Sequence, residues 1–431
     1  MIKMFKTIRE MLKDSRYLAT MKEQNDLLRA TLEKEREQKA ETDLEKYQKR
    51  KQNYLRPVNE MKEFVRSHYE VRHNVVTDVY EYRRREDGLE APFVMIDKRQ
   101  FNTIANEVEG ADIFCLDSFV RRNLECDFAY DYHPVTDYLN KVRGRWDGVD
   151  RVTELLSRIS EEDYCLRMGR VWLRAVVAQW LHYDQDHANA VMLLLVSERQ
   201  GMHKSTFVKN LLPPCLRDRY TDDFSLATKG NAQRKMVEFA IINMDEFDKM
   251  PVKKMPDLKS MMQSLKPSFI GAYKKSFNQL PRIASFVGTS NKRRLLTDRS
   301  GSRRFLILEP DDVIRTDQID YDQLYAQLVS EVEQGEQFYF TKDMEQEMQK
   351  RNQQYYRLEP VEELISTFFR KARDGEEPRE VGSAQIMKQL DRHNHKLMCQ
   401  MSQSVFGKHM RRLGFSARHT EQGNVYEVVE R

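Results

Sequence analysis

The sequence of 431 residues has few cysteines and no long apolar run. Its five cysteines form no Cys-x-x-Cys pair and no Cys/His cluster, which argues against a zinc site and a disulfide framework. The longest apolar run, 190–196, is far shorter than the roughly 20 residues that span a bilayer. In the N-terminal segment charges interrupt every apolar stretch and no cleavage site follows, so it predicts neither a signal nor an anchor. We therefore expect a cytoplasmic protein with no membrane partner.

The charged residues are abundant but nearly balanced in sign. The chain has 72 Lys and Arg against 68 Asp and Glu, a net charge of +4, which is too small to indicate nucleic-acid binding by itself. A claim of DNA binding must therefore depend on local basic clusters. The length predicts roughly two to four structural units.

The first 140 residues divide into two predicted parts. Residues 1–57 carry apolar side chains at helical spacing and then a dense run of charges, which predicts a solvated helix or weak coiled coil that Pro57 ends. A helix for oligomerisation or for a partner is the alternative. Residues 58–140 predict a small α/β module, with a hairpin turning at 76–78, a short strand in FVMI and a helix in FNTIANEV.

The rest of the chain predicts an α/β core between two helical parts. Residues 141–188 form a helical collar, with one helix at about 161–183. Within 189–356 four apolar runs fit buried central strands of an α/β sheet, namely AVMLLLV, FAIINM, IASFVGT and RRFLIL. Residues 357–431 predict three helices and then two strands that turn at Gly423, which is the order of a winged helix.

The loop after the first of these runs has features of a phosphate-binding loop. It ends in Lys204, Ser205 and Thr206 at the start of a predicted helix. A lysine there reaches phosphate oxygens, and a hydroxyl holds Mg²⁺. Gly201 is retained, but Glu198 and His203 stand where the GxxxxGK[ST] pattern has glycines, and a side chain at 203 lies where backbone should approach the phosphates. An ordinary capped helix is the alternative.

Three later features occur in the order of an ATPase. Asp245 and Glu246 follow the second apolar run, where one carboxylate can hold the water shell of Mg²⁺ and the next can polarise the attacking water. Asn291 follows the third run, where a γ-phosphate would lie. Arg303 and Arg304 precede the fourth run, as an arginine finger acting across a subunit boundary would. Taken singly, an acidic turn and a solvated basic turn remain alternatives.

At these residues the chain resembles the virulence-associated protein E family, P-loop ATPases of phages, plasmids and other mobile elements. The resemblance covers roughly 130–310 and includes the segments DYHPVTDYLNKVRGRWDGVDR, INMDEFDK and LPRIASFVGTSNKRRLLTDRSGSRRF. It implies a core similar to superfamily 3 helicases of the AAA+ class, ATP and Mg²⁺ as cofactors, DNA as a partner and a homo-oligomeric ring, a hexamer first of all. The site it implies contains Gly201, His203, Lys204, Ser205, Thr206, Asp245, Glu246, Asn291 and one of Arg303 and Arg304.

Two basic clusters are candidate DNA contacts. The resemblance nominates Lys274 and Lys275, in a hairpin that would grip single-stranded DNA in the pore of a ring. Lys408, Arg411 and Arg412 lie on a predicted helix of the C-terminal part, where they would bind duplex DNA. A solvated lysine turn and a winged helix used for protein contact are the alternatives. The competing hypotheses for the whole chain are a non-catalytic DNA-binding or regulatory protein with a degenerate nucleotide pocket and an interaction protein organised by its N-terminal helix.

Overall fold

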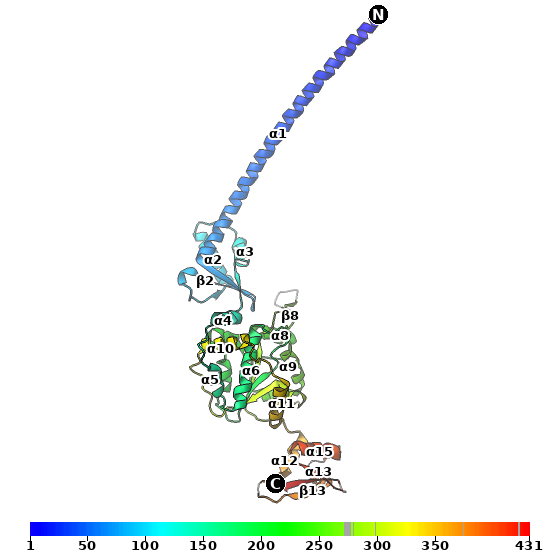
Figure 1. Ribbon diagram of the computed structural model, residues 1–431. Coiled ribbons are helices and arrows are strands. Elements are labelled where there is room, and N and C mark those ends of the chain that lie inside the picture. The colour runs from blue at the N-terminus through cyan, green and yellow to red at the C-terminus, as the bar shows by residue number, and fades with distance from the viewer. Residues whose placement is uncertain (271–276, 279, 298, 374, 421–422) are drawn as a thin grey trace. The chain divides into compact units, whose positions relative to one another are not determined.

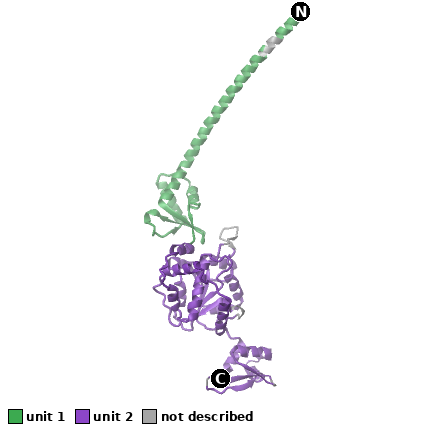
Figure 2. Ribbon diagram, in the orientation of Figure 1, with its two compact units in different colours: residues 1–133 green, residues 134–431 purple. Residues whose placement is uncertain are grey.

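The computed structural model describes the chain apart from residues 271–276, 279, 298, 374 and 421–422. It divides into two compact units, Met1–His133 and Pro134–Arg431 (Figure 2). Among the described residues, no helix combines the length and the apolar composition that crossing a membrane requires.

The first unit begins with one long helix, α1 (Ile2–His68), which passes through Pro57 (Figure 1). The predicted end of the helix at Pro57 is therefore wrong. A proline inside a helix removes one backbone hydrogen bond, but Met61 and Val65, one and two turns later, are fully buried in the core of this unit. Burial of each of these side chains contributes about 1.5–3 kcal/mol, which compensates for the lost bond.

A small sheet follows α1 and is covered by two helices. Its strands are β1 (Tyr69–Asn74), β2 (Val79–Arg84), β3 (Val94–Met95) and β4 (Tyr130–Tyr132), in the order β3-β2-β1-β4. The helices are α2 (Lys98–Gly110) and α3 (Asp117–Leu124). The predicted hairpin, short strand and helix are confirmed as β1–β2, β3 and α2. Phe101, Ile104 and Val108 of α2 are buried on one face of that helix and pack in the core of the unit.

The second unit contains a five-stranded sheet whose described strand pairs are all parallel. The strands are β5 (Met192–Val196), β6 (Tyr220–Thr221), β7 (Ile241–Met244), β10 (Ser285–Ser290) and β11 (Phe305–Leu308), in the order β11-β5-β10-β7-β6. The four predicted apolar runs are confirmed as β5, β7, β10 and β11. In the sheet β10 lies between β5 and β7, so the ends of these three strands are neighbours.

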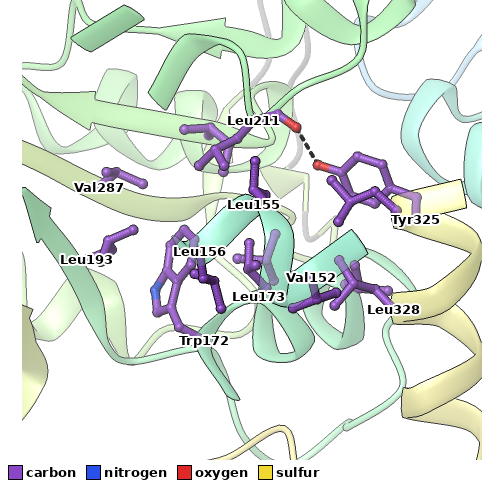
Figure 3. Close-up of a cluster of buried hydrophobic side chains, with 14 of the residues drawn as sticks. Val152, Leu155, Leu156, Trp172, Leu173, Leu193, Leu211, Val287, Tyr325 and Leu328 are labelled. Carbon is purple, nitrogen blue, oxygen red and sulfur yellow. Dashed lines mark hydrogen bonds between the residues drawn. The ribbon is translucent and has the colours of Figure 1, made fainter. Parts of the chain in front are cut away.

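Helices cover both faces of this sheet, which is why β5 and β11 are apolar throughout and β7 is mostly apolar. One face packs on α4 (Pro134–Val142), α5 (Arg151–Ser157), α6 (Asp163–Trp180) and α10 (Tyr321–Glu333). Figure 3 shows Leu193 and Val287 of the sheet beside Trp172 of α6 and Leu155 and Leu156 of α5. The other face packs on α8 (Lys229–Glu238) and α9 (Met255–Met262), and the remaining helices of this region are α7 (Lys204–Lys209) and α11 (Lys342–Arg351).

The C-terminal part has its own hydrophobic core. Its helices are α12 (Pro360–Phe368), α13 (Ser383–His393), α14 (His395–Met398) and α15 (Gln403–Arg412), and its strands are β12 (Phe369–Arg370), β13 (Arg379–Gly382), β14 (Ala417–Thr420) and β15 (Gly423–Glu430). The three predicted helices and two predicted strands are confirmed as α12, α13, α15, β14 and β15. β15 pairs antiparallel with each of the other three strands.

Candidate functional site

Lys204 and Asn291 meet where β5 and β10 end. Lys204 begins α7, directly after the loop that follows β5, and its Nζ donates to Asn291 Oδ1 at 2.8 Å and to the carbonyl of Ser197 at 3.2 Å. The lysine is buried, with 7% of its surface exposed. Burial lowers the pKa of Lys204, and the negative charge of Asp245 partly opposes this effect. The loop therefore holds an ammonium group beside the amide of a neighbouring strand end.

Asp245 follows β7, and its side chain accepts hydrogen bonds from two hydroxyl groups. Ser205 Oγ, from the first turn of α7, donates to Asp245 Oδ1 at 3.2 Å, and Thr289 Oγ1, from β10, donates to the same oxygen. One carboxylate oxygen is thus shared by hydroxyls from two other elements. Carboxylate and hydroxyl oxygens are ligands that Mg²⁺ accepts, so Ser205 and Asp245 fit this ion as the sequence predicts.

The loop between β5 and α7 uses left-handed backbone at two positions. Gly201 has φ 74°, and His203, the residue before the helix, has φ 55° and ψ 25°. A non-glycine residue in this region is uncommon. His203 therefore adopts a backbone conformation that glycine adopts at no steric cost, and both His203 and Thr206 are exposed.

Glu246 is adjacent to Asp245 but turns toward a different partner. Its backbone is also left-handed, with φ 51° and ψ 44°. The side chain is 56% exposed, and Oε2 pairs with Lys249 Nζ at 2.7 Å. The backbone N–H of Glu246 donates to Asp245 Oδ1 at 3.2 Å, but no described hydrogen bond joins the Glu246 side chain to the side chains of Lys204, Ser205, Asp245 and Asn291.

Arg303 and Arg304 lie at the opposite edge of the sheet. They end the 3₁₀ turn 299–304 and immediately precede β11, whereas the cluster lies after the carboxyl ends of β5, β7 and β10. Because the strands are parallel, residues before a strand and residues after its neighbours lie at different edges. Arg303 instead pairs with Glu345 of α11 at 3.0 Å. The structure does not bring these arginines to the cluster of their own chain.

The predicted DNA contacts have three different outcomes. Lys274 and Lys275 lie outside the described residues, between β8 (Phe269–Ile270) and β9 (Phe277–Asn278), which pair antiparallel. Lys408 and Arg411 are exposed on α15. Arg412, although it is exposed, has partners within the chain, as described next.

Arg412 belongs to an ionic cluster that ties α12 to α15. It donates to Glu359 at 2.6 Å and pairs with Glu362 at 3.5 Å, and the buried His409 bonds Glu362 at 3.0 Å. Ligand atoms of Glu359, Glu362 and His409 lie within 4.8 Å of one another, as a metal site requires. The guanidinium of Arg412 already supplies positive charge there. The arrangement therefore fits a set of ion pairs that holds α12 against α15 rather than a metal site.

Two residues that the sequence-based prediction did not include, Thr289 and Asp248, join β10 to the turn that follows β7. Thr289 donates to Asp245, and Asp248, which is 7% exposed, accepts from Ser290 Oγ at 3.0 Å. The signal in the sequence is weak. Thr289 and Ser290 end an apolar run, and Asp248 continues the acidic stretch that begins at Asp245. Only the position of β10 beside β7 shows that these residues meet.

The fold and the cluster define a mixed α/β protein with a parallel sheet whose carboxyl edge gathers a lysine, a serine, an aspartate and an asparagine. A sequence model of the virulence-associated protein E-like domain matches residues 139–357, which is more than half of the chain. The chain therefore belongs to the virulence-associated protein E-like family. A model of a domain of unknown function from B. theta matches residues 359–428.

The individual proteins that the chain resembles are only distantly similar to it. Among solved structures, the apo form of the C-terminal region of NrS-1 is 12% identical, with a TM-score of 0.42, and the alignment covers 87% of this chain and 99% of that one. The A form of the same region is 11% identical, with a TM-score of 0.40 and the same coverage. No curated protein matches the chain.

Proposed function

We propose that this protein binds and hydrolyses Mg·ATP with a P-loop core of the AAA+/superfamily 3 helicase type and acts on DNA during replication of a phage or other mobile element. The observation that carries the proposal is the meeting of Lys204, Ser205, Asp245 and Asn291 at one edge of the parallel sheet. The position of β10 between β5 and β7 supports the proposal, because this strand order brings the turn after β10 next to the turns after β5 and β7.

Each side chain of the cluster has a role in this proposal. Lys204 would exchange its bond to Asn291 for phosphate oxygens, and Asn291 would then be free to contact the γ-phosphate. Ser205 and Asp245 would hold Mg²⁺, which neutralises charge on the phosphates when it is bound. Glu246 would leave Lys249 and polarise the attacking water. The exposure of Glu246 supports this step, since its surface pair contributes little to stability.

The proposed assembly is a ring, a hexamer first of all, with ATP between subunits. Its support is the position of Arg303 and Arg304, at the edge of the sheet opposite to the cluster. An arginine that neutralises the transferred phosphate would then have to come from a neighbouring subunit. The partner of Arg303 within the chain, Glu345, is half-buried, and the Arg303 side chain is more exposed, so we expect only a modest cost in free energy when Arg303 leaves this ion pair.

The proposed DNA contacts lie in two parts of the chain. Lys274 and Lys275 would contact single-stranded DNA in the pore, and Lys408 and Arg411 would contact duplex phosphates from a winged-helix-like C-terminal domain. The exposure of Lys408 and Arg411 on one helix supports the second contact. Arg412 is a weaker candidate, since two glutamates already pair with it.

A second candidate function is a DNA-binding regulatory protein that keeps the nucleotide pocket without turnover. The observations that favour it are the pairing of Glu246 with Lys249 and the side chains at 198 and 203 in place of glycines. In this candidate function Lys204 and Asp245 stabilise the fold, and DNA binding is independent of ATP.

Steady-state hydrolysis of ATP, with and without single-stranded DNA, tests the proposal. We expect the wild type to hydrolyse ATP in the presence of Mg²⁺ and Lys204→Ala to lose this activity, because the variant lacks the charge that binds the phosphates. Lys209→Ala is the matched control, since Lys209 is an exposed lysine at the other end of the same helix. No turnover above Lys204→Ala, or equal turnover in both variants, would reject the ATPase.

A further inference from the structure

The turn after β7 is held in place by Asp248, which lies two residues beyond Glu246. The Asp248 carboxylate is nearly covered, with 5% of the side chain exposed. It accepts a hydrogen bond from Ser290 Oγ at 3.0 Å and pairs with Lys292 Nζ at 3.2 Å. Ser290 and Lys292 flank Asn291. A buried carboxylate thus joins the turn that carries Glu246 to the turn that carries Asn291.

The same turn is held from a second side by Arg357. The Arg357 guanidinium donates to the backbone carbonyl of Asp248, and the Arg357 amide donates to the carbonyl of Leu296 at 2.8 Å. Arg357 follows the 3₁₀ turn 352–355 and directly precedes the C-terminal part of the chain. Side chain and main chain of Asp248 are therefore fixed by different elements.

These contacts matter because the backbone of Glu246 is strained. Left-handed backbone at a non-glycine residue persists only where the surrounding structure holds it. Here Phe247 is buried beside Phe305, with ring centroids 5.6 Å apart, and anchors the next position of the turn. Asp248 then fixes the position after that. The direction of the Glu246 side chain thus depends on residues that do not reach the nucleotide site.

We infer that Asp248 and Arg357 are positioning residues for ATP hydrolysis. They keep Glu246 and Asn291 in a fixed relation, so that the group that polarises water and the group at the γ-phosphate act on the same nucleotide. The inference deepens the proposed ATPase and rests on it. Among the described residues, no hydrogen bond or ion pair joins either residue to the four side chains that would bind nucleotide and metal, so their loss should slow turnover without weakening substrate binding.

Steady-state kinetics of the full chain test this assignment. For Asp248→Asn and Arg357→Ala we expect kcat to fall at least about tenfold while KM for ATP changes by less than about twofold. Arg357→Lys should recover part of kcat, because a lysine can still donate to the Asp248 carbonyl. Asp257→Asn is the control for the loss of a carboxylate, since Asp257 is exposed on α9.

The outcomes separate this inference from the proposed function. If the wild type shows no turnover above Lys204→Ala, the ATPase and the inference both fail. If the wild type turns over and Asp248→Asn and Arg357→Ala keep their kcat, only the inference fails. A parallel loss of kcat, ATP binding and melting temperature would assign the two residues to folding alone and would also overturn it.

Discussion

The carboxyl edge and the amino edge of the main sheet differ in the charged and polar residues that lie there. At the carboxyl edge, three turns that are distant in sequence bring Lys204, Asp245 and Asn291 together. At the amino edge Arg303 and Arg304 precede β11, with Arg303 held by Glu345. A four-residue strand spans about 13 Å, so the length of β11 separates these arginines from the carboxyl edge. This separation is the basis for the proposed site that is shared between copies of the protein.

The strongest test of this division removes both arginines. We expect the double substitution Arg303→Ala and Arg304→Ala to lower kcat by about a thousandfold, as removal of an arginine finger does. Binding of ATP should persist, because the carboxyl edge is intact. Hydrolysis and equilibrium nucleotide binding are the measurements. Arg379→Ala, an exposed arginine in β13 of the C-terminal part, is the control.

Mixing two inactive variants sharpens the same point. Subunits with the double arginine substitution keep Lys204, and Lys204→Ala subunits keep the arginines. If the site forms across a subunit boundary, a random equal mixture should restore about a quarter of the sites. Activity that stays at the sum of the separate variants would contradict a shared site.

Glu246→Gln tests the carboxyl edge alone. Loss of the group that polarises water should lower kcat by about a hundredfold or more, whereas ATP should bind as in the wild type. Single-turnover hydrolysis and binding of a fluorescent nucleotide measure the two effects. Unchanged hydrolysis would show that the pair of Glu246 and Lys249 is only a surface contact. Asp257→Asn again controls for charge.

Thr289→Val tests the support of the proposed metal ligand. The substitution keeps the shape of the side chain and removes the hydroxyl that donates to Asp245. We expect about tenfold more Mg²⁺ to be needed for half-maximal hydrolysis, because groups that orient a metal ligand have effects of this size. Thr221→Val, in β6 of the same sheet, should leave Mg²⁺ dependence unchanged.

The pH dependence of nucleotide binding gives the smallest expected effect. Burial lowers the pKa of Lys204 from 10.5, so this lysine loses its proton at a lower pH than an exposed one. The protonated form binds phosphate, and affinity should therefore fall as the pH rises through the lowered pKa, by at most about tenfold per pH unit. The free energy of unfolding should instead increase as the pH rises from the lowered pKa towards 10.5, because the cost of burying the charged lysine is fully present below the lowered pKa and is lost across this range.

Lys204→Arg provides the comparison for this titration. Arginine keeps its charge over the whole accessible range, so the affinity of the variant should be nearly independent of pH. Fluorescence titrations of nucleotide at several pH values measure both proteins. Identical profiles would mean that Lys204 does not titrate in the bound site.

Local patterns predicted most of the main fold. The apolar runs of β5, β7, β10 and β11 were recognisable because strands covered on both faces carry apolar residues on both faces, at successive positions. β6 was missed, since a strand of two residues has no pattern of its own. The end of α1 was predicted wrongly at Pro57, because the residues that carry the helix onward are stabilised by packing in a core that the local sequence does not describe.

The candidate site was predictable in its members but not in its arrangement. Lys204, Asp245 and Asn291 were recognised by their place after apolar runs. Arg412 was chosen for its charge alone, and only the packing of α12 against α15 shows that Glu359 and Glu362 pair with it. Asp248 was not chosen, because its partner Ser290 is distant in sequence and close only across the sheet.

Short-range chemistry thus settled which residues form strands, which turns carry charge and which loop has the residue types of a phosphate site. These features depend on side chains within a few positions of one another. The order β11-β5-β10-β7-β6 and the burial of Asp248 were decided only by tertiary structure. So was the separation of Arg303 from Lys204. Pairing of strands joins segments far apart in the chain, and its free energy comes from contacts that no local pattern contains.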